Sequence, residues 1–347
     1  SAFTDNLTLY GKSITGDNTG RIQGFSIGSA SYTDNGYLND LITKGPWVDV
    51  RAFGAKGDNV TDDTAAIQAA IDFADSLLTS YTTGQIIYGN SAIGTISPVY
   101  FPRGIYRVTS QLTYGLYTKF KSDQQAIISQ ADNTADIFHS DVAYQNEFSG
   151  LTFVGGNTHI FAQNGPTGHI GQEGGIVLIK NCNFQVSHSW AVQFLKSGAG
   201  GGDAGVIKDS KFMHCAKAIK TVFDVASATD IWVEPHTSYN FADNTAQVEN
   251  HAVLNLDRFI GIPDGTYAGL THRWIDNYGF VKITNSRFGG EGGGGIPVVY
   301  NYANAVSGLA YPYVGSYAVI IKDSFLACVR GVGGVLVAKS GLPHIID

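Results

Sequence analysis

The chain of 347 residues contains little charge, since only 15% of its residues are Asp, Glu, Lys or Arg. The net charge of −7 argues against nucleic acid or an anionic membrane surface as a partner. For the same reason, an acidic glycan would need locally placed basic residues to bind. No apolar run approaches the roughly 18 residues of a membrane-spanning helix. The sequence therefore predicts no membrane insertion.

Cysteine is also scarce. The three cysteines, Cys182, Cys215 and Cys328, follow no zinc-binding spacing, and their odd number leaves at least one unpaired. Cys182 stands where related segments of the chain have serine, so we interpret it as a small buried apolar residue. No histidine pair has a strong metal-binding spacing, and no Ser–His–Asp signature is present. We therefore expect neither a metal nor a cofactor.

Glycine and hydrophobic residues are abundant, with 43 Gly, 44% hydrophobic and 12% aromatic residues. This composition is typical of stacked strands joined by many tight turns, and the length is ample for a large core.

The segment 48–72 predicts a strand, a turn and a helix in close succession. Val48 and Val50 alternate with polar residues as in a half-buried strand. Gly54 and Gly57 then break the strand and permit backbone angles that other residues avoid.

A helix is predicted directly after this turn. Thr61, Asp62 and Asp63 offer side-chain oxygens to the free N–H groups of a helix start. The residues that follow form one apolar stripe at helical spacing, so the helix covers a hydrophobic surface. The stripe consists of Ala66, Ile67, Ala70, Ile71 and Ala74.

These residues resemble a known family. The pattern 53–58, Phe-Gly-Ala-Lys-Gly-Asp, followed by Thr-Asp-Asp-Thr-Ala-Ala-Ile-Gln-Ala-Ala at 61–70, looks like the opening segment of the pectate-lyase-like superfamily. The segment 99–108, Val-Tyr-Phe-Pro-Arg-Gly-Ile-Tyr-Arg-Val, resembles the strand–turn–strand that follows there. The resemblance implies an all-β fold, a single-stranded right-handed parallel β-helix with an N-terminal capping α-helix. It is specific for the fold and says little about chemistry.

A six-residue pattern recurs further along the chain. An aliphatic residue is followed by Lys or Thr, by Asn or Asp, by Ser or Cys, and then by an aromatic residue or leucine. The copies lie at 179–184, 207–212, 283–288 and 321–326, with a weaker copy at 148–153. We interpret each copy as a strand that ends in a tight polar turn, where Asn and Asp tolerate left-handed backbone angles, and re-enters the core with Phe.

The copies are unequally spaced, with 28 residues between Phe184 and Phe212 but 76 between Phe212 and Phe288. Unequal spacing indicates irregular coils with loop insertions. The alternative is a β-sandwich with chance similarity between strands. The predicted organisation is a neck or linker at 1–45, the opening segment and capping helix at 46–110, and β-helix coils at 111–347.

The segment 230–236, Asp-Ile-Trp-Val-Glu-Pro-His, offers the first candidate site. If its two aliphatic residues point inward, alternation places Asp230, Trp232 and Glu234 on the outer face. Asp230 and Glu234 would then be about 13 Å apart, too far to act directly as a pair.

A partner for Glu234 is expected about one coil later. The two leucines of the segment 254–257, Leu-Asn-Leu-Asp, can align with the two aliphatic residues of the earlier segment. That register places Asp257 beside Glu234, with Trp232 as a platform for a sugar ring. Glycoside hydrolysis uses such a pair of carboxyl groups, and stacking raises the pKa of one of them, as a general acid requires. The alternative is solvated surface acids, with Trp232 under a loop or at a subunit contact.

Glycine-rich loops supply further candidates. Glu173 and Asp203 each precede a repeat strand and are the next catalytic candidates. Glu291 is flanked by glycines that permit close approach of a ligand. Ordinary tight turns are the alternative explanation for the glycine-rich loops that carry these three residues.

A sparse basic and phenolic set keeps a different reaction open. A lyase acting on a uronate needs a base for the C5 proton and a cation near the carboxylate. Ordinary loop contacts are the alternative. The residues of the set are Arg258, His272, Arg273 and Tyr278, and His236 is a further substrate-binding candidate.

The resemblance to bacteriophage tailspikes and capsule depolymerases implies binding, and hydrolysis, of a bacterial surface polysaccharide. It also implies a homotrimer attached to a virion baseplate or tail through an N-terminal part and assembled in the host cytoplasm. If the protein is bacterial, we expect it to be secreted or extracellular. Two alternatives stay open: a polysaccharide lyase acting by β-elimination, and a non-catalytic receptor-binding or structural spike. The glycan itself depends on groove shape and is not predicted.

Overall fold

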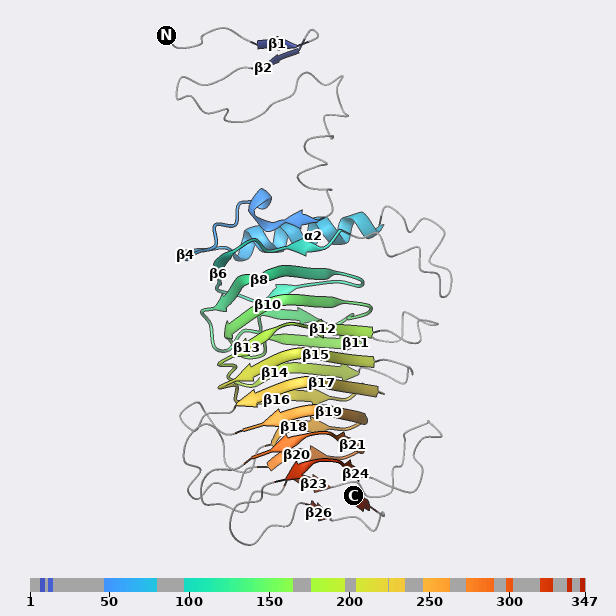
Figure 1. The fold of residues 1–347 in the computed structure, drawn as a ribbon. Coiled ribbons are helices and arrows are strands. Elements are labelled where there is room, and N and C mark those ends of the chain that lie inside the picture. Colours follow the sequence, from blue (N-terminus) through green and yellow to red (C-terminus); the bar gives the residue numbers. More distant parts are fainter. Residues whose placement is uncertain are drawn as a thin grey trace.

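The computed structural model describes residues 7–9, 12–14, 47–79, 97–164, 176–196, 204–223, 225–234, 246–262, 273–289, 298–301, 319–326, 336–338 and 344–346. In these ranges the chain winds through two parallel sheets, so that successive coils stack along one axis (Figure 1). Two further strands, β1 (Leu7–Leu9) and β2 (Lys12–Ile14), form a short antiparallel hairpin that pairs with neither parallel sheet. The predicted parallel β-helix is confirmed.

The larger sheet has 16 strands within the described ranges. Its strands are β3 (Val48–Asp49), β4 (Asp58–Asp62), β5 (Val99–Tyr100), β6 (Gly104–Val108), β8 (Lys119–Gln130), β10 (Glu147–Gly155), β12 (Ile176–Lys180), β13 (Asn183–Gln185), β15 (Ala204–Met213), β17 (Val225–Glu234), β19 (Val253–Gly261), β21 (Phe280–Thr284), β22 (Arg287–Phe288), β24 (Val319–Lys322), β25 (Phe325–Leu326) and β27 (His344–Ile346).

The smaller sheet has nine strands in the same part of the chain. They are β7 (Leu112–Thr113), β9 (Phe138–Ser140), β11 (Ile160–Asn164), β14 (Trp190–Lys196), β16 (Lys217–Thr221), β18 (Ala246–Asn250), β20 (Arg273–Asn277), β23 (Val299–Asn301) and β26 (Leu336–Ala338). Each coil therefore contributes one strand to the smaller sheet and one bent, or broken, strand to the larger sheet.

The opening segment folds largely as predicted. β3 leads into a 3-10 turn, η1 (Val50–Phe53), and Gly54 and Gly57 adopt positive φ values of 104° and 61°. The helix α2 (Thr64–Thr79) follows and lies at the N-terminal end of the stack (Figure 1). The most buried residues of its apolar stripe, with no exposed surface, are Ile67, Ala70, Ile71 and Ala74. Its role as a cap remains our interpretation.

One detail of the helix start differs from the prediction. Asp62 does accept a hydrogen bond from the backbone N–H of Thr64 at 3.1 Å. The carboxylate of Asp63, however, accepts from the N–H groups of Lys56 and Gly57 at 2.7 and 2.9 Å. Asp63 therefore holds the glycine turn together, while Thr61 donates its hydroxyl to Asp58 rather than serving the helix.

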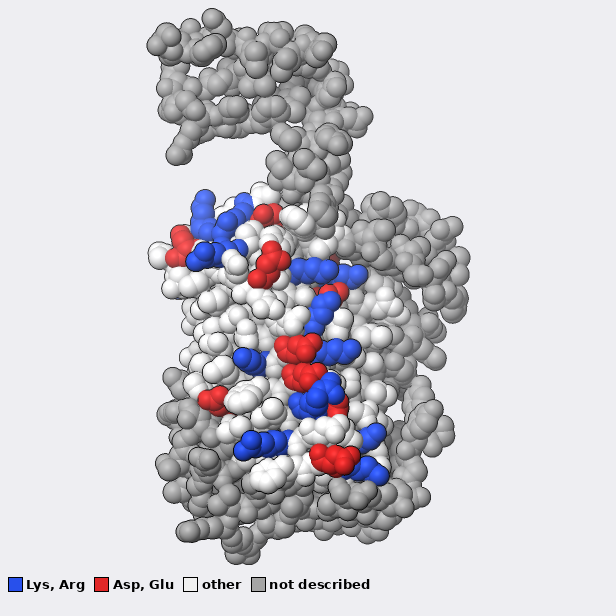
Figure 2. Space-filling model, in the orientation of Figure 1, with Lys and Arg blue, Asp and Glu red and all other residues white. Residues whose placement is uncertain are grey.

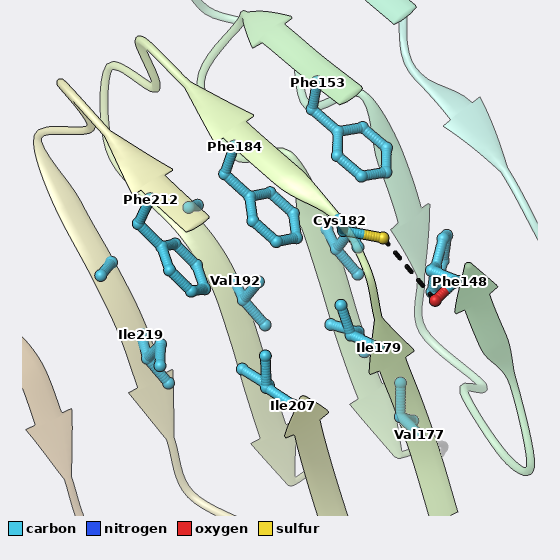
Figure 3. Packing of buried hydrophobic residues seen from close by; sticks show 14 of the residues in the cluster. Phe148, Phe153, Val177, Ile179, Cys182, Phe184, Val192, Ile207, Phe212 and Ile219 are labelled. Carbon is cyan, nitrogen blue, oxygen red and sulfur yellow. Dashed lines mark hydrogen bonds between the residues drawn. The ribbon is translucent and has the colours of Figure 1, made fainter. Parts of the chain in front are cut away.

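The core consists of columns of like side chains from successive coils. Phe153, Phe184 and Phe212 stack with ring centroids 5.0 and 4.7 Å apart, as Figure 3 shows. Burial of one such ring contributes about 1.5–3 kcal/mol, and the stacked contact adds about 0.5–1.5 kcal/mol. Cys182 lies in a neighbouring column with 1% of its surface exposed, and its backbone N–H binds the hydroxyl of Ser210 in the next coil. Its predicted role as a small buried residue is confirmed.

A column of left-handed residues bends each coil. Within the larger sheet the strand turns at one residue with positive φ, and in most coils this residue is Gly, Asn or Asp, as the repeat predicted. The column contains Gln124, Gly150, Asn181, Asp209, Asp230, Arg258, Asn285 and Asp323. We call the strand segments before and after this residue the pre-turn and post-turn halves.

The long interval between Phe212 and Phe288 contains two further coils. Phe212 pairs with Val233, Val233 with Gly261, and Gly261 with Phe288, in steps of 21, 28 and 27 residues. These two coils lost the phenylalanine of the repeat. At Gly261 the space is taken by Trp274 of the smaller sheet, because an added Cβ would lie only 2.8 Å from that ring.

Buried asparagines form a second column, in the smaller sheet. Asn250 Nδ2 donates to Asn277 Oδ1 at 2.7 Å, and Asn277 Nδ2 donates to Asn301 Oδ1 at 2.8 Å. The side chain of Asn250 also donates to the backbone carbonyl groups of Ala252 and Phe280. Buried polar groups need such partners, so this column fixes the turn that leaves the smaller sheet. No helix in the described ranges is long and apolar enough to cross a membrane.

Candidate functional site

The predicted pairing of Glu234 with Asp257 is wrong. In the register of β17 with β19, Asp257 lies opposite Thr229, and the predicted partner Glu234 lies five residues further along the strand. Glu234 itself lies opposite Met213 of the preceding coil. The two leucines of β19 align with Ala226 and Ala228 of the pre-turn half, and not with the aliphatic residues after the turn.

Asp257 instead lies beside Asp230, and Arg258 binds both carboxylates. Its Nε and Nη2 donate to Asp230 at 2.6 and 2.8 Å, and its Nη1 donates to Asp257 at 2.5 Å. Asp257 also accepts hydrogen bonds from Asn285 and Thr284 at 2.8 and 2.9 Å.

These contacts determine the charge of the two carboxylates. Hydrogen bonds from Arg258 lower the pKa of Asp230, and hydrogen bonds from Asn285 and then Thr284 lower the pKa of Asp257. Both groups are therefore held ionised. The expectation that stacking next to Asp257 would raise a pKa and create a general acid is wrong at this place.

Trp232 and Glu234 do lie together on the outer face. The indole N–H of Trp232 donates to Glu234 Oε2 at 3.0 Å, across the two-residue spacing of one strand face. Glu234 thus holds the ring of Trp232 in place. The role of Trp232 as a sugar platform stays a prediction.

Most of the other predicted site residues lie outside the part of the chain that the structure describes. Arg273 begins β20, but its side chain is not described. Five further candidates lie outside the described residues: Glu173, Asp203, His236, His272 and Glu291.

The structure brings a different pair of carboxylates together, on the outer face of the smaller sheet. Glu249 of β18 and Asp276 of β20 are register partners in adjacent coils. Neighbouring strands are about 4.8 Å apart, so the two side chains emerge side by side. Asp276 is buried, with 7% of its surface exposed, and the side chain of Glu249 is about one quarter exposed.

Cationic and aromatic groups surround this pair. Lys220 Nζ and His251 Nε2 each lie 2.8 Å from Glu249 Oε1. The ring of His251 stacks on Tyr278 with centroids 4.4 Å apart and planes 5° apart. We call these residues with Asp276 the Glu249 cluster.

A second lysine lies at the margin of the cluster. Lys217 Nζ lies 4.7 Å from the centre of the Trp190 ring, and Lys220 Nζ lies 5.9 Å from it. Both contacts are within the range of cation–π attraction.

The surroundings lower the pKa values of two charged groups here, Glu249 and Lys217, for different reasons. The hydrogen bond from His251, followed by that from Lys220, lowers the pKa of Glu249 to about 2. Burial lowers the pKa of Lys217, opposed by the negative charges of Glu249 and Asp276. Glu249 is thus a permanent anion, whereas Lys217 loses its proton more readily than an ordinary lysine. Within the described residues no group of three or more His, Cys, Asp or Glu side chains could hold a metal ion.

Tyr278 had been named from the sequence, but Glu249 and Asp276 were missed. A triplet that recurs in the sequence could have pointed to both residues. The triplets Val-Glu-Asn at 248–250, Ile-Asp-Asn at 275–277 and Val-Tyr-Asn at 299–301 each place an aliphatic residue and an asparagine inward, with a polar residue between them that points outward.

Comparison with known proteins agrees with this architecture. Residues 47–164 match the model of the family described as rhamnogalacturonase A/epimerase, pectate lyase-like. This part of the chain is thus similar to a pectate-lyase-like domain. The matched residues end before β12, so this match does not extend to the Glu249 cluster.

Two relatives with similar sequences come from a phage and from a fungus. Depolymerase 1, capsule K30/K69-specific, of Klebsiella phage K5-2 is 26% identical over 46% of this chain and 24% of its own length. Non-secreted LysM effector LysM15 of Penicillium expansum is 37% identical over 27% of this chain and 6% of its own length. This chain therefore spans only a minor part of either relative.

Among solved structures, the N-terminal fragment of the bacteriophage Phi29 gene product 12 is similar with a TM-score of 0.41. It is 14% identical, and the match covers 80% of this chain and 47% of that chain.

Proposed function

We propose that the chain binds a bacterial surface polysaccharide and hydrolyses it at the Glu249 cluster. The observation that carries this proposal is the register pair of Glu249 and Asp276 in adjacent coils. The spacing of neighbouring strands, about 4.8 Å, is close to the separation of about 5–5.5 Å that retaining glycosidases use. Similarity to a capsule depolymerase of Klebsiella phage K5-2 supports the substrate class.

The roles follow from the surroundings of each carboxyl group. Glu249 is kept ionised by His251 and Lys220, which suits a nucleophile at the sugar ring. Asp276 is buried next to that anion and is the proposed general acid, which donates a proton to the leaving glycosidic oxygen. After the glycosyl–enzyme bond forms, Asp276 takes a proton from water, and the resulting hydroxide releases the sugar from Glu249.

The test is incubation with a panel of capsular polysaccharides that includes the K30 and K69 types, followed by mass spectrometry of the products. Glu249→Gln and Asp276→Asn should each reduce cleavage by a factor of about 100 or more. Asp257→Asn and Asp230→Asn remove matched carboxylates from adjacent coils of the larger sheet and should leave the rate unchanged. Full activity of both Glu249→Gln and Asp276→Asn would eliminate this site.

A second candidate, elimination at a uronate, rests on a specific observation. Burial lowers the pKa of Lys217, next to Glu249 and Asp276, and a lysine with a lowered pKa can act as a base. A lyase would leave an unsaturated uronate that absorbs in the near ultraviolet, whereas hydrolysis gives only new reducing ends. Loss of ultraviolet-absorbing product in Lys217→Ala would favour elimination. Binding of a glycan without shortening would favour the third candidate, a receptor-binding spike.

The assembly is part of the same proposal. We infer a homotrimer located in a virion tail, supported by similarity to the phage depolymerase. Light scattering on the purified chain gives the mass of the assembly, and a monomer would remove this part of the proposal without affecting the site.

A further inference from the structure

A strip on the outer face of the larger sheet combines aromatic and cationic side chains. Five residues occupy the same outward position in consecutive coils, two residues after the left-handed turn residue, and we call them the post-turn strip. They are Lys211, Trp232, Ile260, Arg287 and Phe325. With about 4.8 Å per coil, the strip is roughly 19 Å long. It belongs to the larger sheet, so the core separates it from the Glu249 cluster.

The aromatic ring in the middle of the strip is fixed before any ligand binds. The hydrogen bond from Trp232 to Glu234 selects one ring orientation. A ring already held in place loses little side-chain entropy on binding, which favours its use as a contact surface. Because Glu234 is engaged in this bond, it serves to orient the ring rather than to cleave a sugar.

The two cations of the strip have no carboxylate partner among the residues that the structure describes. Lys211 makes no ion pair there, and the guanidinium of Arg287 lies 5.6 Å from the ring centre of Phe325. The nearby turn column differs in this respect, since its Arg258 is bound by both Asp230 and Asp257. Among the described residues, Lys211 and Arg287 are thus in no ion pair, in a chain with a net charge of −7.

The strip also exposes apolar surface. Phe325 has 61% of its surface exposed. Figure 2 shows acidic and basic side chains in a central band along the stack and in a group at its upper left, with fewer charged side chains in the rest of the area left of the band. Together with Trp232 and Ile260, this ring offers apolar surface beside two cations that are in no ion pair with a described residue.

We propose that the post-turn strip is a second glycan-binding site that holds an acidic polysaccharide without cleaving it. Flat rings and aliphatic surface contact the apolar faces of sugar rings, while Lys211 and Arg287 pair with carboxylates on the glycan. The charge of the strip selects this occupant: two cations at separate coils match a polymer with repeated negative charge. Two sites on one polymer raise the apparent affinity through effective concentration.

The test measures binding alone, in the full chain carrying Glu249→Gln so that the glycan stays intact. Affinity electrophoresis in gels containing polygalacturonate or the K30 and K69 capsular polysaccharides gives the dissociation constant, with dextran as the neutral glycan. Trp232→Ala and Arg287→Ala should weaken binding of at least one acidic glycan about tenfold, which corresponds to about 1.4 kcal/mol. Lys211→Ala should weaken it as well, and added salt should reduce it further.

Lys208→Ala is the matched control, because Lys208 lies on the same strand as Lys211 but before the turn. It should bind as the parent does. The proposal is overturned if the strip variants bind like this control, or if no acidic glycan binds more tightly than dextran. It is also overturned if Trp232→Ala changes the mass of the assembly in light scattering and leaves glycan binding unchanged, because the strip is then a contact with a second copy. Failure of the proposed function is a separate result, seen as absence of cleavage by the unmodified chain.

Discussion

Asp230 and Arg258 occupy the same left-handed turn position in adjacent coils, and two hydrogen bonds join their side chains. Arg258 adopts a φ of 49°, where most other coils have Gly, Asn or Asp. A long side chain is less suited to this backbone region than those residues. At this exception to the repeat, Arg258 donates two hydrogen bonds to the carboxylate of Asp230, at 2.6 and 2.8 Å.

Replacing Arg258 by Asn should raise the pKa of Asp230 more than that of Asp257. Hydrogen bonds from Arg258 are the main cause of the lowered pKa of Asp230, whereas Asn285 is the main cause for Asp257. Titration of the side-chain carboxyl carbons by NMR measures both values. Because the ion pair is exposed and Asn tolerates the turn, the melting temperature should change little.

Asn285→Ala is the converse variant and should raise the pKa of Asp257 more than that of Asp230. Equal shifts of the two carboxyls in both variants would contradict the assignment of causes.

Gly205 should not tolerate even one methyl group. Its Cβ would lie 2.4 Å from the ring of Phe194 across the core, so Gly205→Ala should lower the free energy of unfolding by about 1–3 kcal/mol. Shortening the ring in Gly205→Ala/Phe194→Leu should recover part of this loss relative to the sum of the single variants. Chemical denaturation measures all three variants.

Gly289→Ala is the control for Gly205→Ala, because the nearest atom to its Cβ would be 3.7 Å away. A loss in Gly289→Ala as large as that in Gly205→Ala would show that the close contact with Phe194 is not the cause.

His159 should make the free energy of unfolding depend on pH. Burial lowers its pKa to about 3, against an ordinary value of 6.5, and its ring lies beside the stacked rings of Phe153 and Phe184, with centroids 6.0 and 5.8 Å away. Between pH 3 and 6.5 the unfolded chain therefore binds a proton at this residue that the folded chain does not. The stabilisation that neutral His159 contributes is fully present above pH 6.5. Below pH 6.5, its contribution to the free energy of unfolding falls by about 1.4 kcal/mol per pH unit.

The measurement compares the free energy of unfolding of the unmodified chain and of His159→Phe at pH 5 to 7, where ordinary carboxylates stay ionised. The difference between the two should change with pH in the direction given, because phenylalanine keeps the aromatic column without a titrating group. His139 acts in the opposite direction, since a hydrogen bond to Asp136 raises its pKa, but it contributes equally to both proteins. Parallel pH profiles would refute the prediction for His159.

Much of the fold was predictable because it depends on local rules. The apolar stripe with Ile67 and Ile71 specified one face of a helix, and Gly54 and Gly57 specified left-handed turns. The repeat copies at 179–184 and 207–212 align with each other in the structure as they do in the sequence, because both have a phenylalanine that fills the same core column.

The candidate site was not predictable in the same way. Long strands of the larger sheet contain the inward–outward–inward pattern twice, once before and once after the left-handed residue. In β17 these are Ala226 with Ala228, and Ile231 with Val233. The larger aliphatic pair resembled a core strand more closely, so the leucines of β19 were aligned with the wrong half. At the position where other coils have the repeat phenylalanine this coil has Gly261, and its Phe259 lies two residues earlier, opposite Ile231, so the repeat did not correct the alignment.

The sequence by itself determined the left-handed turns and the faces that strands bury, because these follow from alternation, glycine and the turn preference of Asn and Asp. The parallel coil was implied by the resemblance of residues 53–70 and 99–108 to a known family. Tertiary structure decided the register between coils, since that depends on how side chains from both sheets fill one core, as Trp274 does opposite Gly261. The register in turn places Asp257 with Asp230 and Arg258, and Glu249 with Asp276. Which carboxylates are neighbours is therefore a property of packing across the whole coil, and no single strand contains it.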